Sequence, residues 1–156
     1  MEDALVINRA REFFRELGDI AADHNTMICL EPIPPEYGSN FMTDVPSTAA
    51  MVRAVEHPAI QMQLDVGALT MNGENASSVL ETDGELVAHI HASEPQLQVL
   101  GDCSTDHGPI ASAIRQHCPD RIVAIEMLEK HSAPLDSIER ALIFATSWYG
   151  NTQDNV

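Results

Sequence analysis

The sequence predicts an α/β fold in which four parallel strands alternate with helices. Short apolar runs recur along the chain, and segments with helical spacing of apolar residues lie between them. Each apolar run ends in a carboxylate or an imidazole. Strands that alternate with helices form a parallel sheet with right-handed crossovers, and such sheets carry their chemistry at the carboxyl ends of the strands.

The first part of the chain supplies two helices and one strand. Asp3–Asp23 places apolar side chains at helical spacing with charges between them, and the strand Met27–Glu31 follows. Three prolines exclude regular structure from Pro32–Gly38. A second helix is expected over Asp44–Glu56, and Pro58 prevents its continuation.

The middle of the chain supplies two strands. The first is Ile60–Asp65, and a loop is expected from there through Asn75. A weaker helical stretch, Ala76–Glu81, leads into the strand within Leu86–Glu94. Residues 95–106 are of mixed composition and are expected to form a longer loop.

The last part of the chain completes the alternation. His107–His117 is predicted as a helix, Arg121–Glu126 as the fourth strand and Pro134–Tyr149 as the final helix. Residues 150–156 are expected to be a flexible tail. The length suits one domain, so residues 1–156 are expected to form a single α/β unit.

Charge and hydropathy narrow the classes of partner. Eight Lys and Arg residues stand against 24 Asp and Glu residues, which gives a formal net charge of −16. That balance cannot build a basic face for nucleic acid, and it suits a cation site. The sequence shows neither a signal peptide nor an apolar run of about 18 residues, so a cytoplasmic protein without a membrane span is expected.

The residues at the strand ends are candidate metal ligands. Glu31, Asp65, His91 and Glu126 stand 34, 26 and 35 residues apart, and each gap is about one βα unit. Carboxylates with one neutral imidazole suit a single divalent ion such as Mn, Mg, Co or Zn. The alternative is that these residues are only solvated strand ends or helix caps.

The segments around these residues match a known pattern. Leu30-Glu-Pro32, Leu64-Asp-Val-Gly67, His89-Ile-His-Ala-Ser-Glu94 and Ile125-Glu126 resemble the second half of the xylose-isomerase-like TIM barrels, the sugar phosphate isomerase/epimerase group. The resemblance runs from about residue 20 to residue 148. It implies the C-terminal half of a (β/α)8 barrel.

The resemblance also implies an activity. Glu31, Asp65, His91 and Glu126 would hold one divalent ion. Glu31 and Glu126 would be the catalytic pair, transferring a proton of a sugar or sugar phosphate through an enediolate. A metal-dependent dehydratase or lyase of the same fold, or a non-catalytic half-barrel fragment, are the alternatives. An endonuclease ranks last because the charge is unsuitable and no additional His ligands are visible.

Three features depart from the family pattern. The sugar epimerases place a His three residues after the metal-binding Asp and an Arg six residues after the metal-binding His; here these positions are Ala68 and Leu97. The Glu that follows the first ligand has no clean equivalent, since Glu36 and Tyr37 straddle its position. The groups that recognise the sugar are therefore changed while the metal ligands are kept.

Further residues are expected to contribute to the site. Those expected to contact substrate are Tyr37, Asn40, Ser93 and Glu94, and those expected to support the ligands from behind are His89 and His107. A structural Tyr37 is an equal alternative, and Ser93 or Glu94 could instead orient His91. Strand alternation places His89 on the face of His91, where a hydrogen-bonded core histidine is expected.

A half-barrel leaves two sheet edges unpaired. The chain is therefore expected either to be a fragment of a longer protein or to assemble. A homodimer could complete an eight-stranded barrel or could bury the exposed faces side by side.

Overall fold

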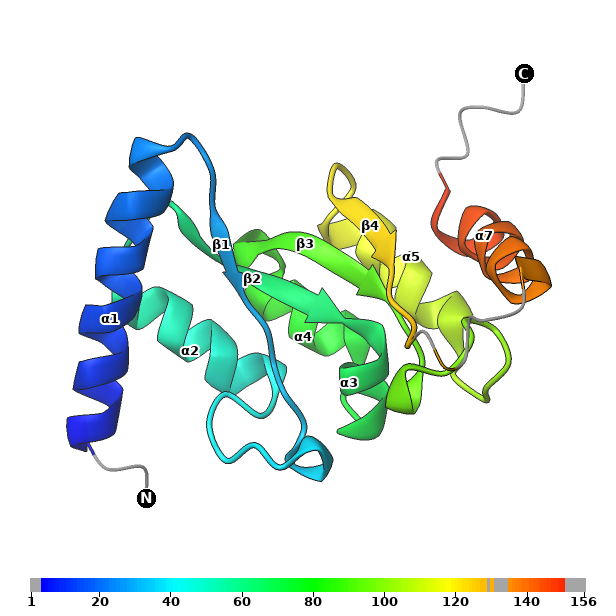
Figure 1. The fold of residues 1–156 in the computed structure, drawn as a ribbon, viewed down its shortest axis with the longest axis horizontal. Helices are drawn as coiled ribbons and strands as arrows, with labels where there is room; N and C mark the ends of the chain where they lie inside the picture. Colours follow the sequence, from blue (N-terminus) through cyan, green and yellow to red (C-terminus); the bar gives the residue numbers. More distant parts are fainter. Residues whose placement is uncertain (1–3, 129, 131–134, 151–156) are drawn as a thin grey trace.

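The computed structural model describes residues 4–128, 130 and 135–150 of the chain. Its centre is a parallel sheet of four strands in the order β1-β2-β3-β4 (Figure 1). The strands are β1 (Ile28–Leu30), β2 (Ile60–Asp65), β3 (Val87–Ala92) and β4 (Ile122–Ile125). The predicted alternation of four parallel strands with helices is confirmed.

The helices pack in a row along one face of this sheet (Figure 1). In this row α1 contacts α2, α2 contacts α4, α4 contacts α5, and α5 contacts α7. The α-helices are α1 (Ala4–Asp23), α2 (Val45–Val55), α3 (Val66–Met71), α4 (Ala76–Asp83), α5 (His107–His117) and α7 (Leu135–Tyr149). Short 3-10 helices are η1 (Pro35–Tyr37), η2 (Gly84–Leu86) and η3 (Pro95–Leu97).

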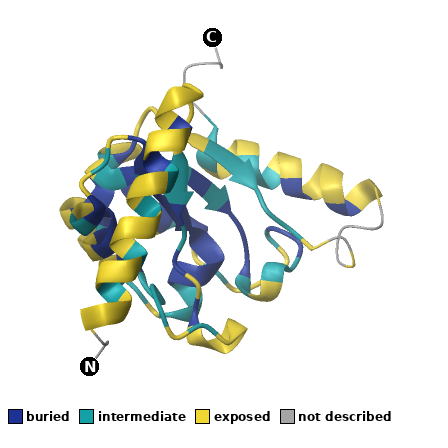
Figure 2. Cartoon of the chain, turned by 60° about the vertical axis from the view of Figure 1, so that its left-hand side comes forward, coloured by how far each residue is buried: buried dark blue, intermediate teal, exposed yellow. Residues whose placement is uncertain are grey.

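The hydrophobic core lies between the sheet and this row of helices (Figure 2). Ile60, Met62 and Leu64 alternate along β2, and all three are buried in the core cluster. The side chains between them, such as Gln61 and Gln63, point to the opposite face because successive residues of a strand alternate. The flanking helices α1 and α7 remain largely exposed (Figure 2).

One α-helix and the three 3-10 helices were not predicted. The exclusion of regular structure from Pro32–Gly38 was wrong for η1, because the fixed φ of a proline suits the first position of a short helix. The segment after β2 was expected to be a loop, but Val66–Met71 forms α3. The Asp65 side chain caps this helix by accepting a hydrogen bond from the Ala68 backbone N–H at 2.6 Å. The helix is too short to show apolar periodicity in the sequence. The cap that Asp65 forms at the end of β2 stabilises its start.

The sheet ends on both sides at an unpaired strand among the described residues, β1 on one side and β4 on the other. Ile122 of β4 is 71% exposed, which is consistent with an open sheet edge. None of the described helices has the length and apolar character to cross a membrane. Apart from Gly150, the tail predicted at residues 150–156 lies outside the described residues.

Candidate metal centre

Four candidate ligands gather at the carboxyl ends of the four strands. Glu31 directly follows β1, Asp65 ends β2, His91 lies near the end of β3 and Glu126 directly follows β4. One potential ligand atom from each of these side chains lies within 4.8 Å of those of the other three. The structure therefore brings together the four residues that the sequence predicted as ligands.

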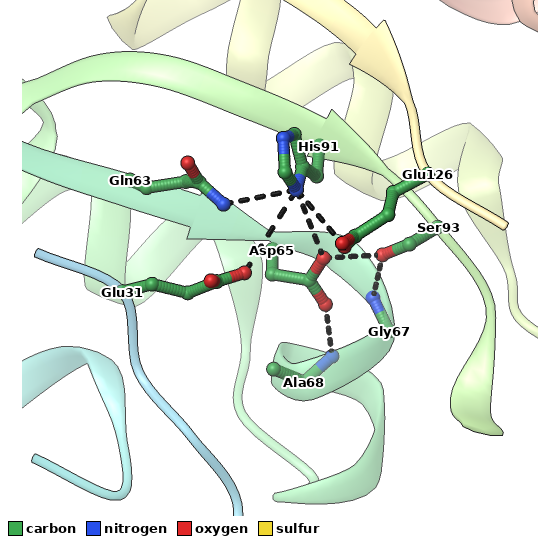
Figure 3. Close-up of polar contacts among 8 residues, drawn as sticks. All are labelled: Glu31, Gln63, Asp65, Gly67, Ala68, His91, Ser93 and Glu126. Carbon is green, nitrogen blue, oxygen red and sulfur yellow. Dashed lines mark hydrogen bonds and ion pairs between the residues drawn. The ribbon is translucent and has the colours of Figure 1, made fainter. Parts of the chain in front are cut away.

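The imidazole of His91 lies at the centre of the group (Figure 3). Its Nδ1 atom is 3.0 Å from Glu126 Oε2, 3.8 Å from Glu31 Oε1 and 3.9 Å from Asp65 Oδ2. A ring nitrogen carries at most one hydrogen, so it can donate to only one of these oxygens. The arrangement leaves an excess of negative oxygen around one point, and a divalent cation fits that set of donors.

The surroundings of this group destabilise the charged forms of two of its carboxylates. Burial raises the pKa of Glu31, and the negative charges of Asp65 and Glu126 raise it further against the opposing effect of His91. Burial also raises the pKa of Asp65, although hydrogen bonds from Ala68 and Ser93 act in the opposite direction. A bound cation would favour the charged form of both carboxylates.

The carboxylate of Asp65 is fixed from two sides (Figure 3). The Ala68 backbone N–H donates to Oδ1 at 2.6 Å, and the Ser93 hydroxyl donates to Oδ2 at 2.7 Å. The same hydroxyl oxygen accepts the backbone N–H of Gly67 at 2.9 Å. A Cβ at position 67 would lie 2.7 Å from the Glu94 carbonyl oxygen, so only glycine allows this close approach of α3.

Ser93 was expected to contact substrate, but in the structure it is buried beside Asp65. Its side chain has no exposed surface, which prevents contact with a substrate in this geometry. The alternative expectation, that Ser93 orients a ligand, fits the hydrogen bond that it donates to Asp65 rather than to His91. Alternation along a strand end cannot reveal this, because the burial of Ser93 comes from the packing of α3 against it.

Glu94 and His107 form a second, buried group, and the partly buried Tyr149 contacts it. Glu94 Oε1 is 3.0 Å from His107 Nε2 and accepts the Gly101 backbone N–H at 3.0 Å, while His107 Nδ1 is 2.5 Å from the Tyr149 hydroxyl. Burial alone raises the pKa of Glu94, but the imidazole of His107, together with further hydrogen bonds that include the Gly101 N–H, leaves the pKa lowered. This group ties the end of β3 to α5 and α7.

In the second group Glu94 and His107 make contacts that differ from those predicted for them. Glu94 has no exposed surface, so its expected contact with substrate is not available in this geometry. His107 contacts Glu94 and not the four candidate ligands, and it is the first residue of α5 as its sequence position suggested. Tyr149 was missed because its partner His107 lies 42 residues away and gives no local signal.

Gln63 and His89 lie on the same face of the sheet as His91. Gln63 was missed, although its spacing of two residues from Asp65 could have revealed it; its amide nitrogen is 2.9 Å from His91 Nδ1. The ring of His89 meets that of His91 edge-on, with 5.1 Å between the centroids. His89 is half-exposed rather than a core histidine, because no described element covers this face of β3.

A small cavity of about 140 Å³ adjoins the candidate ligands. Tyr37, Ala68 and Leu97 line it together with Glu31, Asp65 and Glu126. The ring of Tyr37 therefore lies where a substrate contact was predicted. Asn40 is exposed beyond η1 and is not among the lining residues, so its predicted contact has no counterpart in this geometry.

Solved structures share this fold at low identity. A D-psicose 3-epimerase from Clostridium cellulolyticum H10, solved with D-tagatose, superposes with a TM-score of 0.82 at 18% identity over 93% of this chain and 57% of its own. A D-allulose 3-epimerase from Methylomonas sp. in complex with D-allulose gives 0.75 at 21% identity over 86% and 52%. A probable 3-DHS dehydratase from Bacillus anthracis gives 0.63 at 19% identity over 86% and 56%.

The chain thus spans just over half the length of these proteins. This fraction agrees with a half-barrel of four strands. No curated protein matches the sequence. The family model for the xylose isomerase-like TIM barrel matches residues 2–145. The chain belongs to the xylose isomerase-like TIM barrel family.

Proposed function

We propose that the chain provides the metal-binding half of a sugar isomerase or epimerase. The observation that carries this proposal is the convergence of Glu31, Asp65, His91 and Glu126 within 4.8 Å at the carboxyl ends of the strands. Parallel α/β folds place their active sites at this end. Sugar epimerases among the solved structures support the same class of reaction.

The proposed cofactor is one divalent ion. Three carboxylates and one imidazole favour Mn or Mg, while Co and Zn are also compatible with the set. When bound, the ion would draw electron density from the neighbouring carbonyl and hydroxyl oxygens of the substrate. It would so lower the pKa of the C–H bond beside the carbonyl.

Glu31 and Glu126 are the proposed proton-transfer pair. They follow β1 and β4, the two outer strands, so they reach the cavity from opposite sides, and both line it. One carboxylate removes the proton from the carbon beside the carbonyl, and the electron pair moves onto the carbonyl oxygen to give an enediolate. Return of a proton to the opposite face yields an epimer, whereas return to the adjacent carbon yields an isomer.

Asp65, Ser93 and Gln63 hold this arrangement in place. Ser93 and Ala68 restrain both oxygens of the Asp65 carboxylate, and Gln63 contacts His91. Hydrogen bonds of this kind fix the orientation of ligands and typically change metal affinity by about 10–100-fold when removed.

A dehydratase or lyase is the second candidate. The probable dehydratase from Bacillus anthracis has the same fold, and Ala68 and Leu97 leave the cavity without the His and Arg expected of a sugar epimerase. Both reactions begin with removal of a proton beside a carbonyl. They differ in the next step, which is return of the proton or loss of water.

A homodimer is the proposed assembly. The outer edges of β1 and β4 are unpaired among the described residues, and an apolar hollow of about 390 Å³ lies between β4 and α7. Leu142 and Ile143 on α7 are 54% and 62% exposed. Association of two copies would cover these surfaces. A non-catalytic half-barrel would instead bind a partner but turn nothing over.

The test combines metal content, native mass and isotope exchange. The purified protein is loaded with Mn²⁺ and incubated in D₂O with D-allulose or D-fructose, and deuterium at the exchanging carbon is read by NMR. Exchange without loss of water would support an isomerase or epimerase. A new unsaturated product would support a dehydratase, and tight metal binding with no exchange for any ketose or keto acid would leave the half-barrel fragment.

A further inference from the structure

The cavity beside the candidate ligands has one acidic side and one apolar side. Glu31, Asp65 and Glu126 form the acidic side. The remaining lining residues are Pro32, Ile33, Pro34, Tyr37, Ala68 and Leu97. The described residues enclose about 140 Å³ of the cavity. The described wall therefore suits a molecule with one oxygen-rich end and one hydrocarbon end.

The backbone conformation fixes the position of Leu97. Gln96 and Leu97 have φ angles of +59° and +51°, which residues other than glycine seldom adopt. The Leu97 N–H donates to the Glu94 carbonyl at 2.9 Å, and the Leu97 carbonyl accepts the Leu128 N–H at 3.1 Å. Hydrogen bonds on both sides of the residue hold it in this conformation, so the apolar side chain is fixed at the cavity wall.

Tyr37 presents its ring to the cavity while its hydroxyl contacts the backbone. The hydroxyl oxygen accepts the Gln96 N–H at 3.0 Å, which joins η1 to the turn that carries Leu97. Ala68 adds a methyl group, and its N–H is already bonded to Asp65. The wall opposite the carboxylates thus offers a substrate hydroxyl few free hydrogen-bonding groups.

No basic side chain lines the cavity, although all eight Lys and Arg residues of the chain are among those described. Several of them are engaged elsewhere: Arg53 pairs with Asp83, Arg121 donates to the Val87 carbonyl and Arg140 pairs with Asp102. Phosphate and carboxylate groups are usually recognised by Arg or Lys. The described part of the wall therefore offers an anionic group no basic partner.

We propose that this site selects a small neutral α-hydroxy ketone with a methyl or methylene group toward Ala68 and Leu97. This inference rests on the proposed function and narrows it, because it disfavours sugar phosphates. A hydroxymethyl group at that end would lose its water without gaining a hydrogen bond. A hydrocarbon group would lose nothing and would gain contact with Leu97 and Tyr37.

The test compares three small ketones that differ at one end. Hydroxyacetone carries a methyl group where dihydroxyacetone carries a hydroxymethyl group and dihydroxyacetone phosphate carries a phosphate ester. Their binding to the Mn²⁺-loaded protein is measured by the relaxation of the ketone protons in NMR, which does not depend on turnover. We expect hydroxyacetone to bind about tenfold more tightly than dihydroxyacetone, with the phosphate weakest.

Two variants at position 97 test whether Leu97 causes this preference. Leu97→Asn places a polar side chain that tolerates positive φ at the same point, and it should reduce the preference for hydroxyacetone about tenfold. Leu97→Met keeps the wall apolar and should retain the wild-type order of affinities.

The outcomes separate this inference from the function on which it rests. Equal or tighter binding of dihydroxyacetone or its phosphate by the wild-type protein would overturn the inference alone, as would an unchanged preference in folded Leu97→Asn. A protein that binds no Mn²⁺ would overturn the proposed function and this inference with it.

Discussion

Two groups that pair a carboxylate with a histidine lie at the end of β3, and they differ in burial, in charge and in the number of their partners. His91 is 3.0 Å from Glu126, and His107 is 3.0 Å from Glu94. The side chains of the first pair are 21% and 37% exposed, whereas those of the second are 1% and 0% exposed. Burial and neighbouring charge raise the pKa of Glu31 in the first group, while hydrogen bonds lower that of Glu94 in the second.

The comparison distinguishes a candidate binding site from a group that only connects parts of the fold. In the first group three carboxylates compete for one imidazole nitrogen, so the group lacks positive charge until a cation arrives. In the second group one carboxylate oxygen receives two hydrogen bonds and the imidazole is bonded at both nitrogens. The balance of carboxylates against hydrogen-bond donors distinguishes the two groups.

The largest expected effect is on metal binding through Asp65. Asp65→Asn keeps the shape of the side chain but removes its charge, and Mn²⁺ affinity should fall more than about a hundredfold, beyond the effect of losing a supporting hydrogen bond. Isothermal titration calorimetry measures it. Glu81→Gln, an exposed carboxylate on α4, is the matched control and should bind as the wild type does. Unchanged affinity in Asp65→Asn would remove Asp65 from the site.

The next effect is on stability through His107. His107→Phe leaves the buried Glu94 carboxylate without its imidazole partner, and Glu94 Oε2 already has no hydrogen-bond partner among the described residues. The free energy of unfolding should fall by about 3 kcal/mol, as measured by urea denaturation. The same change at half-exposed His89 should cost about 0.5 kcal/mol or less. Equal losses in the two variants would contradict the comparison.

A smaller effect is expected at Ser93, which lies between His91 and Glu94 in the sequence. Ser93→Ala removes the hydrogen bond to Asp65 Oδ2 and should weaken Mn²⁺ binding by about 10–100-fold. Competition with a chelating dye measures the affinity. Ser112→Ala on the exposed side of α5 controls for loss of a hydroxyl. An affinity within twofold of wild type would show that the Ala68 N–H alone is sufficient to hold Asp65.

The smallest expected effect has the opposite sign. In the metal-free protein Glu31→Gln should raise the free energy of unfolding by up to about 1 kcal/mol, because it removes a partly buried charge that is repelled by Asp65 and Glu126. Thermal unfolding with chelator present measures it. A decrease in stability would mean that the Glu31 charge already has a favourable partner.

The pH dependence follows from the same charges. The raised pKa values of Glu31 and Asp65 mean that the folded protein binds protons more tightly there. Stability of the metal-free protein should therefore rise as pH falls through these raised values toward about 4, the ordinary carboxyl pKa. Below that pH the contribution of Glu94, whose pKa is lowered, is lost. Glu31→Gln should flatten the rise and leave the acid loss unchanged.

The sequence predicted the fold and the convergence of the four candidate ligands because both depend on local patterns. Apolar runs and helical spacing locate the strands, and a parallel sheet brings their carboxyl ends to one edge. The surroundings of the ligands depend on packing between distant segments. Ser93 and Glu94 are polar residues just past a strand, where pattern alone cannot distinguish a buried position from a pocket wall. Their burial comes from α3, η3 and α5.

Each candidate ligand comes from a different strand, and this affects how the protein folds as well as what it binds. An incomplete sheet lacks at least one ligand, so a folding intermediate that has not yet docked β1 or β4 should hold an ion only weakly. Ion capture would then follow sheet assembly, and a bound ion would slow unfolding by holding four strand ends together. In this protein the bound ion would hold the strand ends together. Its rate of release would therefore measure how often the sheet opens.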